Sequence, residues 1–130
     1  MLTFEMIQDA KRALEGIARK TPLDPAPKFG ANVYIKSENL QLTGAFKLRG
    51  AYNKIRSLTP EERERGVIAC SAGNHAQGIA LSAAKLGIRS IICMPAGAPI
   101  SKVEATRSYG AEVVLVPGVY DDAAREAERL

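Results

Sequence analysis

The stretch that decides the fold is VIACSAGNHAQGIALSAAKLGIRSIICMP, residues 67–95. Two apolar runs, at residues 67–70 and 89–94, flank a segment of helical spacing at 74–86, which Gly87 follows. Short apolar runs that alternate with helices of about ten residues are typical of βαβ units, in which neighbouring strands lie parallel. The stretch therefore predicts a buried strand, a helix and a second, parallel strand.

The same alternation continues beyond this stretch. Residues 101–109 predict a helix that Gly110 ends, residues 113–116 predict a third strand, and residues 121–130 predict another helix. The fold class that we expect is α/β, an open parallel sheet with flanking helices in a three-layer αβα arrangement.

The first 65 residues follow a different pattern. Helical spacing marks residues 4–18 and 46–58, a proline-rich connection covers 21–30, and residues 33–38 alternate in the manner of a β-strand. We therefore expect two parts, with the boundary between residues 65 and 66. The second part, residues 66–130, is expected to be a small open α/β domain.

A short helix is also expected just before this boundary. Thr59 and Glu62 have the spacing of a capping box, and Pro60 occupies the first helical position, where its missing N–H costs nothing.

The composition narrows the choice of partners. Of the 130 residues, 46% are hydrophobic and 25% are charged, which is ordinary for a globular domain. The net charge is +4 and the pI is near 9.2, but basic and acidic side chains are interspersed without a basic stripe. We expect no nucleic-acid partner.

The cysteines and the N-terminus indicate the compartment. Cys70 and Cys93 belong to apolar runs, so we expect reduced core residues and neither a disulfide nor a metal site. The first residues do not have the pattern of a signal peptide, and no apolar stretch approaches the roughly 20 residues that span a bilayer. A cytoplasmic protein without a membrane partner is expected.

Two segments carry candidate chemistry, and the first is SAGNHAQG, residues 71–78. It joins a strand to a helix, so unpaired backbone N–H groups at the helix start can bind a phosphate or a carboxylate. Gly73 permits close approach, and Ser71 and Asn74 add polar groups. The alternative is an ordinary turn in which Ser71 or Asn74 caps the helix. His75 is expected to be neutral at this helix end.

The second segment is TGAFKLRG, residues 43–50, which puts Lys47 at the start of an amphipathic helix. A lysine can form a Schiff base once burial or nearby positive charge favours its neutral amine. Phe46 and Leu48 flank Lys47, and Arg49 is a candidate source of such charge. The alternative is an ordinary solvated lysine.

Together, the two segments resemble the threonine/serine dehydratase family of tryptophan-synthase-β-like (fold type II) pyridoxal-phosphate enzymes. The resemblance rests on ENLQLTGAFKLRGA, residues 38–51, followed by SAGNHAQG, and extends to KTPL at 20–23 and to Met94-Pro95. It implies pyridoxal 5′-phosphate as cofactor and an amino acid as the small-molecule substrate.

The resemblance also implies residue roles. Lys47 matches the lysine that binds the cofactor as a Schiff base and moves the Cα proton, Phe46 the residue beside the cofactor ring, and Asn74 the residue that hydrogen-bonds the cofactor's 3′-oxygen. The substrate carboxylate is assigned to a loop made of Ser71, Gly73, Asn74 and His75.

The implied activity is dehydration and deamination of L-threonine to 2-oxobutanoate and ammonia, with a place in isoleucine biosynthesis. Serine racemases carry a second serine where Ala72 stands, so Ala72 favours elimination. Many dehydratases have serine where Ala45 stands, and Ala45 departs from them. A serine dehydratase or racemase, or a non-catalytic anion-binding or structural α/β fragment, are the alternatives.

The family's glycine-rich phosphate loop has no counterpart in these residues. We therefore expect an N-terminal piece, inactive by itself, of an enzyme of the length usual in this family, which is expected to be a homo-oligomer. Residues 1–65 would be the first elements of the large cofactor domain.

Overall fold

Three parallel strands form the centre of the structure, a computed structural model that describes residues 1–130. They are β3 (Val67–Cys70), β4 (Ser90–Pro95) and β5 (Glu112–Val116), and they lie in that order across the sheet. In the register, Cys70 is opposite Cys93, and Cys93 is opposite Val114. The predicted parallel sheet is confirmed.

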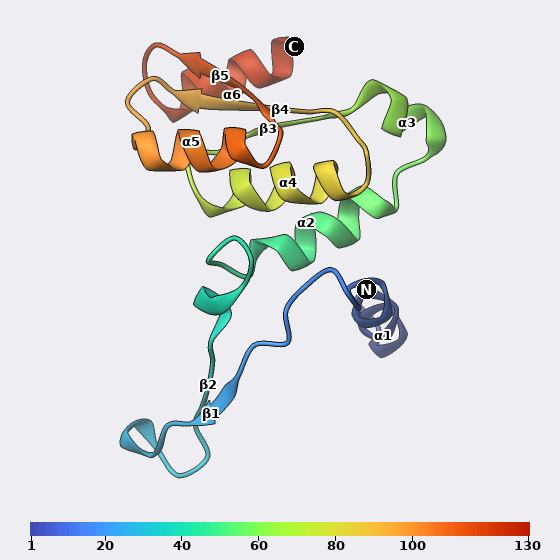
Figure 1. Ribbon diagram of the computed structural model, residues 1–130, viewed down its shortest axis with the longest axis vertical. Coiled ribbons are helices and arrows are strands. Elements are labelled where there is room, and N and C mark those ends of the chain that lie inside the picture. Colours follow the sequence, from blue (N-terminus) through green and yellow to red (C-terminus); the bar gives the residue numbers. More distant parts are fainter.

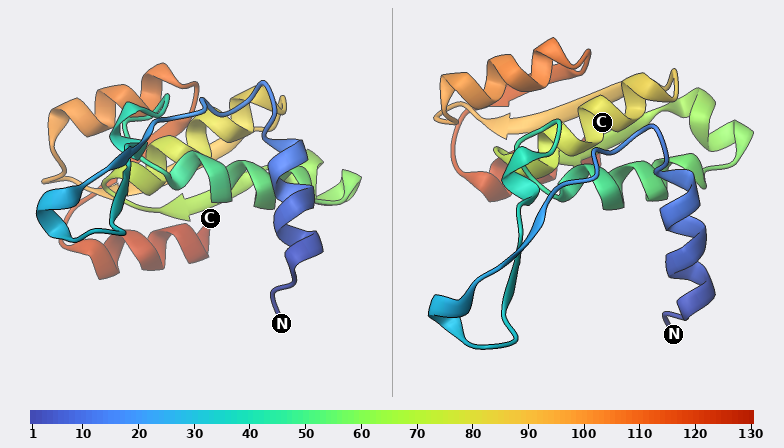
Figure 2. Two further views of the ribbon diagram at one scale, coloured as in Figure 1. Left: turned by 90° about the horizontal axis from the view of Figure 1, so that it is seen from below. Right: turned by 60° about the horizontal axis from the view of Figure 1, so that its bottom comes forward.

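Helices cover both faces of this sheet. On one face lie α4 (Asn74–Lys85) and α5 (Ile100–Ser108), and on the other lies α6 (Tyr120–Arg129), which packs on β3 and β4 (Figures 1 and 2). The middle strand β4 is consequently buried along nearly its whole length, which explains its continuous apolar sequence. The three-layer αβα arrangement is confirmed.

The main core lies between α4, β4 and α5. Its fully buried members include Ala76 and Ala80 of α4 and Ile92 and Met94 of β4. Alanines on α4 allow the helix to pack closely on the sheet, so the start of α4 is held firmly at the carboxyl end of β3.

A further helix, α2 (Lys47–Arg56), packs on the side of α4 that faces away from the sheet (Figure 1). Leu48, Ala51 and Ile55 form its buried stripe. Ile55 packs with Ala83 of α4 and with Ile88 in a second apolar cluster. This packing brings the first turns of two helices together, although they are distant in the sequence.

The remaining elements precede α2 in the sequence or connect α2 to β3. They are α1 (Phe4–Ala13), a hairpin of β1 (Leu23–Pro25) and β2 (Tyr34–Lys36), the 3-10 turns η1 (Pro27–Phe29) and η2 (Glu38–Leu40), and α3 (Pro60–Arg65). The hairpin projects from the rest of the chain (Figure 1). None of the helices combines the length and the apolar character that a bilayer crossing requires.

Three expectations need correction. The first helix stops at Ala13 and not at residue 18, because the chain turns through Gly16, whose φ is 73°. The proline-rich connection contains a short strand, β1, which pairs with β2. Cys93 is buried, as expected, but Cys70 is only half-buried; both thiols are free.

The capping box of α3 is confirmed. The Thr59 hydroxyl accepts a hydrogen bond from the backbone N–H of Glu62, whose carboxylate accepts one from the backbone N–H of Thr59.

Candidate active site

Lys47 is the first residue of α2, at the point where the sequence predicts the helix to start. Its Nζ lies 5.0 Å from the centre of the Phe46 ring, within the range of a cation–π contact. The chain reaches this point through a turn in which the Thr43 hydroxyl donates to the carbonyl oxygen of Ala45 at 3.3 Å. Nζ takes part in none of the hydrogen bonds or ion pairs of the structure, so the amine is available to a ligand.

The backbone of Lys47 lies against α4 at Gly78. A Cβ atom built on Gly78 would come within 3.0 Å of the Lys47 carbonyl carbon and 3.1 Å of the Leu48 nitrogen. Only glycine allows the two helices to come this close. The contact brings Lys47 near the first turn of α4.

The turn between β3 and α4 is organised by Ser71. Its hydroxyl oxygen accepts hydrogen bonds from the backbone N–H groups of Gly73 and Ala76, both at 3.3 Å. The backbone N–H of Ser71 donates to the Cys93 carbonyl at 3.1 Å and so continues the ladder of the sheet. The N-cap position of α4 is Gly73 and not Ser71 or Asn74, but the Ser71 hydroxyl, two residues earlier, satisfies the N–H of Ala76 and is already engaged within the turn.

Asn74 begins α4 and has a partner from another helix. The Nζ of Lys102, in the first turn of α5, donates to Asn74 Oδ1 at 3.2 Å. Lys102 adds a positive charge beside the helix start, where backbone N–H groups already favour an anion.

A cavity of about 250 Å³ unites the two predicted segments. It is lined by Phe46, Lys47, Gly50, Ala51 and His75. Desolvation lowers the pKa of His75, and the nearby charge of Lys47 lowers it further. A pKa lowered mainly by desolvation favours the expected neutral imidazole.

The structure brings together Phe46, Lys47 and His75 in this cavity. Ser71, Gly73 and Asn74 do not line it; they form the adjoining turn. Arg49 does not act as a free positive neighbour of Lys47, because its guanidinium is paired with Glu38.

Sequence reasoning missed Gly78 and Lys102. Lys102 carries no local signal, because only the packing of α5 on α4 brings it to the site. Gly78 interrupts a run of good helix formers, and such a glycine can mark a close helix contact.

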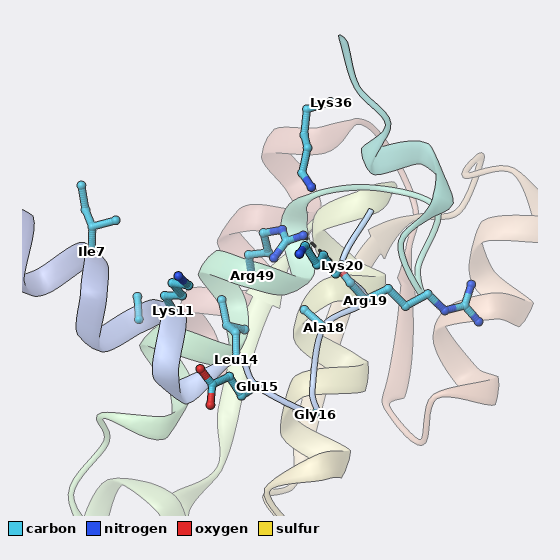
Figure 3. Close-up of a pocket in the computed structure, with 11 residues that line it drawn as sticks. Ile7, Lys11, Leu14, Glu15, Gly16, Ala18, Arg19, Lys20, Lys36 and Arg49 are labelled. Carbon is cyan, nitrogen blue, oxygen red and sulfur yellow. Dashed lines mark hydrogen bonds between the residues drawn. The ribbon is translucent and has the colours of Figure 1, made fainter. Parts of the chain in front are cut away.

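A larger cavity, of about 680 Å³, lies between α1 and the first turn of α2 (Figure 3). It is lined by Leu14 and Arg49, among others, and by none of the residues that the sequence predicts to bind the cofactor or the substrate. The candidate active site is therefore the smaller cavity at Lys47.

The chain belongs to the pyridoxal-phosphate-dependent enzyme family, whose model matches residues 14–130. It is similar to an L-threonine ammonia-lyase of Thermotoga maritima, with 48% identity over 100% of this chain and 33% of that protein. The family resemblance inferred from the sequence is confirmed, and with it the pyridoxal-phosphate dependence of the family.

Solved structures of similar fold support the same family assignment. The processed form of threonine deaminase isoform 2 from Solanum lycopersicum has a TM-score of 0.86 and 40% identity, covering 97% of this chain and 36% of that one. Maize serine racemase has a TM-score of 0.88 and 32% identity, covering 96% and 39% respectively. The chain therefore spans between 33% and 39% of the length of these three proteins.

Proposed function

We propose that the protein containing this chain is a pyridoxal-phosphate-dependent ammonia-lyase that converts L-threonine into 2-oxobutanoate and ammonia. The observation that carries the proposal is the amine of Lys47, which has no hydrogen-bond or ion-pair partner and shares a cavity with Phe46 and His75. The similarity to proteins named threonine ammonia-lyase and threonine deaminase supports the choice of substrate.

The residues present fit one end of the cofactor. Gly78 lets α4 approach Lys47 so closely that a Cβ would fill the gap, and the cavity contains an aromatic ring and no carboxylate. We infer that Lys47 and Phe46 hold the aldehyde and ring end, with Asn74 donating a hydrogen bond from its amide. When bound, pyridoxal phosphate supplies an electron sink for negative charge at the substrate Cα.

The residues of the chain would do the rest of the work. The Nζ of Lys47 would take the Cα proton, and the backbone N–H groups of Asn74 and His75 at the helix start would bind the substrate carboxylate, since that of Gly73 is bonded to Ser71. Ser71 keeps this turn in shape through its two accepted hydrogen bonds. A neutral His75 avoids a second positive charge close to the amine.

The broader assignments follow from the same proposal. Residues 1–65 would belong to the large cofactor domain and residues 66–130 to the small domain. The complete protein would be a cytoplasmic homo-oligomer acting in isoleucine biosynthesis, and residues 1–130 alone would be inactive.

Serine racemization is the competing activity within the family, because maize serine racemase has a similar structure. Ala72 argues against it, since a methyl group carries no proton to deliver to the opposite face of the substrate. We therefore favour elimination.

Reduction with borohydride tests the role of Lys47. The complete gene product, loaded with pyridoxal phosphate, is reduced and mapped by peptide mass spectrometry. The label is expected on Lys47, and Lys47→Ala should abolish turnover without unfolding the protein. Lys54→Ala, near the other end of α2, is the matched control and should retain activity. A label on Lys102 or any other lysine would contradict the proposal.

The same preparation separates the non-catalytic alternative. A simple anion-binding module would bind inorganic phosphate without a Schiff-base absorbance and without release of 2-oxobutanoate.

A further inference from the structure

The carboxylate of Glu38 accepts hydrogen bonds from two residues that lie far from it in the sequence. Arg49 donates from Nε to Oε2 at 2.8 Å and from Nη2 to Oε1 at 2.7 Å, which is the two-point geometry of a guanidinium on a carboxylate. Thr21 donates from Oγ1 to Oε1 at 2.5 Å. These bonds join the segment before β1, the turn η2 and the first turn of α2.

Further bonds hold the same junction. Arg49 Nη2 also donates to the carbonyl oxygen of Arg19 at 3.1 Å. The side-chain amide of Gln41 pairs with the Arg19 backbone, accepting from N at 2.9 Å and donating to O at 3.0 Å. Thr21 and Gln41 are only 5% and 3% exposed. The junction is therefore ordered on both sides of the ion pair.

Arg49 and Lys47 leave the helix in different directions. They are the third and first residues of α2, and a separation of two residues rotates a side chain by about 200° around the axis. Lys47 faces the cavity with His75, whereas Arg49 lines the larger cavity on the α1 side (Figure 3). A contact at Arg49 therefore acts on the first turn of α2 from the side opposite the Lys47 cavity.

The start of α2 lacks the usual means of fixation. Phe46, at the N-cap position, makes no side-chain capping bond, and Gly44, two residues before it, has a φ of 67°. The first turn is instead held between the backbone contact at Gly78 and the ion pair of Arg49 with Glu38.

We propose that Arg49 and Glu38 are positioning residues, whose ion pair fixes the first turn of α2 so that the Lys47 amine stays in the cavity beside Phe46 and His75. The inference rests on the proposed function of Lys47. It assigns to the pair an effect on the chemistry at Lys47 beyond its effect on stability.

The charge state of Glu38 agrees with a persistent ion pair. The hydrogen bonds from Arg49 lower its pKa most, burial opposes them, and the Thr21 hydroxyl lowers the pKa further, to about 2. The carboxylate is consequently charged throughout the neutral range.

The test compares conservative changes at the two ends of α2 in the complete gene product. Glu38→Gln and Arg49→Lys weaken the proposed positioning pair. Arg56→Lys is the matched control, because Arg56 ends the same helix and pairs with Asp9 of α1. Since small displacements of a reacting group cost up to about 100-fold in rate, we expect Glu38→Gln and Arg49→Lys to lower kcat by roughly 10- to 100-fold with little change in KM. Arg56→Lys should leave kcat unchanged.

Hydrogen exchange supplies a readout that needs no cofactor. Without pyridoxal phosphate, Glu38→Gln and Arg49→Lys should speed amide exchange in residues 48–52, whereas Arg56→Lys should not. If either variant fails to fold, Thr21→Val removes a single hydrogen bond from Glu38 and should act in the same direction more weakly.

The outcomes separate the two proposals. A borohydride label on another lysine in the wild type would refute the function of Lys47, and with it the positioning role, even if exchange at residues 48–52 responds as expected. A normal label on Lys47, together with kcat and exchange in Arg49→Lys no different from those in Arg56→Lys, would overturn the positioning role alone.

Discussion

Gly78 of α4 touches the backbone of Lys47 of α2: a Cβ at this glycine would stand 3.0 Å from the Lys47 carbonyl carbon and 3.1 Å from the Lys47 Cβ. The opposing atoms are mostly backbone, so they cannot turn aside as the end of a flexible side chain can. The absence of a side chain at Gly78 therefore sets the distance between the two helices that form the cavity.

Gly78→Ala should destabilise the protein, although alanine favours helices. The helical gain is about 1 kcal/mol, and overpacking against backbone costs about 1–3 kcal/mol, so we expect a net loss of about 1 kcal/mol. Gly50→Ala is the matched control, because nothing lies within 4 Å of its added Cβ. That variant should gain up to about 1 kcal/mol. Urea unfolding of both variants measures the difference, and equal effects would show that the helix contact tolerates a methyl group.

Glu38 should make stability depend on pH in the acid range. Its pKa falls from 4.5 to about 2 on folding, so its contribution is complete above pH 4.5 and is lost as the pH falls towards 2. At pH 7 the free energy of unfolding of the wild type should exceed that of Glu38→Gln by about 2 kcal/mol. The free energies of unfolding of both proteins between pH 7 and 3 test this, and a difference that stays constant over this range would contradict it.

Ala72 should keep the protein a lyase. Chiral chromatography of the serine that remains after partial reaction should find almost no D-serine, because residue 72 has no group that can protonate the opposite face. Ala72→Ser introduces such a hydroxyl and should raise D-serine formation. Substantial D-serine from the wild type would show that another group donates the proton.

A polypeptide restricted to residues 1–130 should bind pyridoxal phosphate only weakly and release no 2-oxobutanoate. The cofactor's phosphate carries about two negative charges and needs several oriented donors, which a single lysine and one amide do not supply. Titration with cofactor, followed by an assay for 2-oxobutanoate, tests this against the complete gene product. Stoichiometric micromolar binding with turnover would contradict it.

The sheet and its covering helices were predictable because all three strands form apolar runs that alternate with helical spacing, although only β4 is buried along nearly its whole length. The elements of the N-terminal part were less predictable from the sequence. Strand β1 has three residues, one of them proline, and gains its conformation only by pairing with β2. The first helix is shorter than its sequence pattern predicts, because the apolar spacing persists to Ile17 while the backbone already turns at Gly16.

The candidate site was predictable as two segments but not as one cavity. Lys47 and His75 meet because α2 packs on α4, which depends on long-range contacts such as that of Ile55 with Ala83. The sequence gives no sign that Arg49 is paired, because only the turn between η2 and α2 brings Glu38, 11 residues earlier, against its guanidinium. Only the resemblance to a family indicated that the two segments form one site, because nothing in the local sequence shows that α2 packs on α4.

The hydrogen bond between Lys102 and Asn74 gives the two ends of the Asn74 amide different tasks. An ammonium group can only donate, so the oxygen of the amide is turned towards Lys102 and the NH2 group is turned away from it. What Asn74 offers to an incoming molecule is then a pair of N–H donors. The turn consequently selects by polarity: an oxygen with free lone pairs is matched, and a group that itself needs an acceptor is refused.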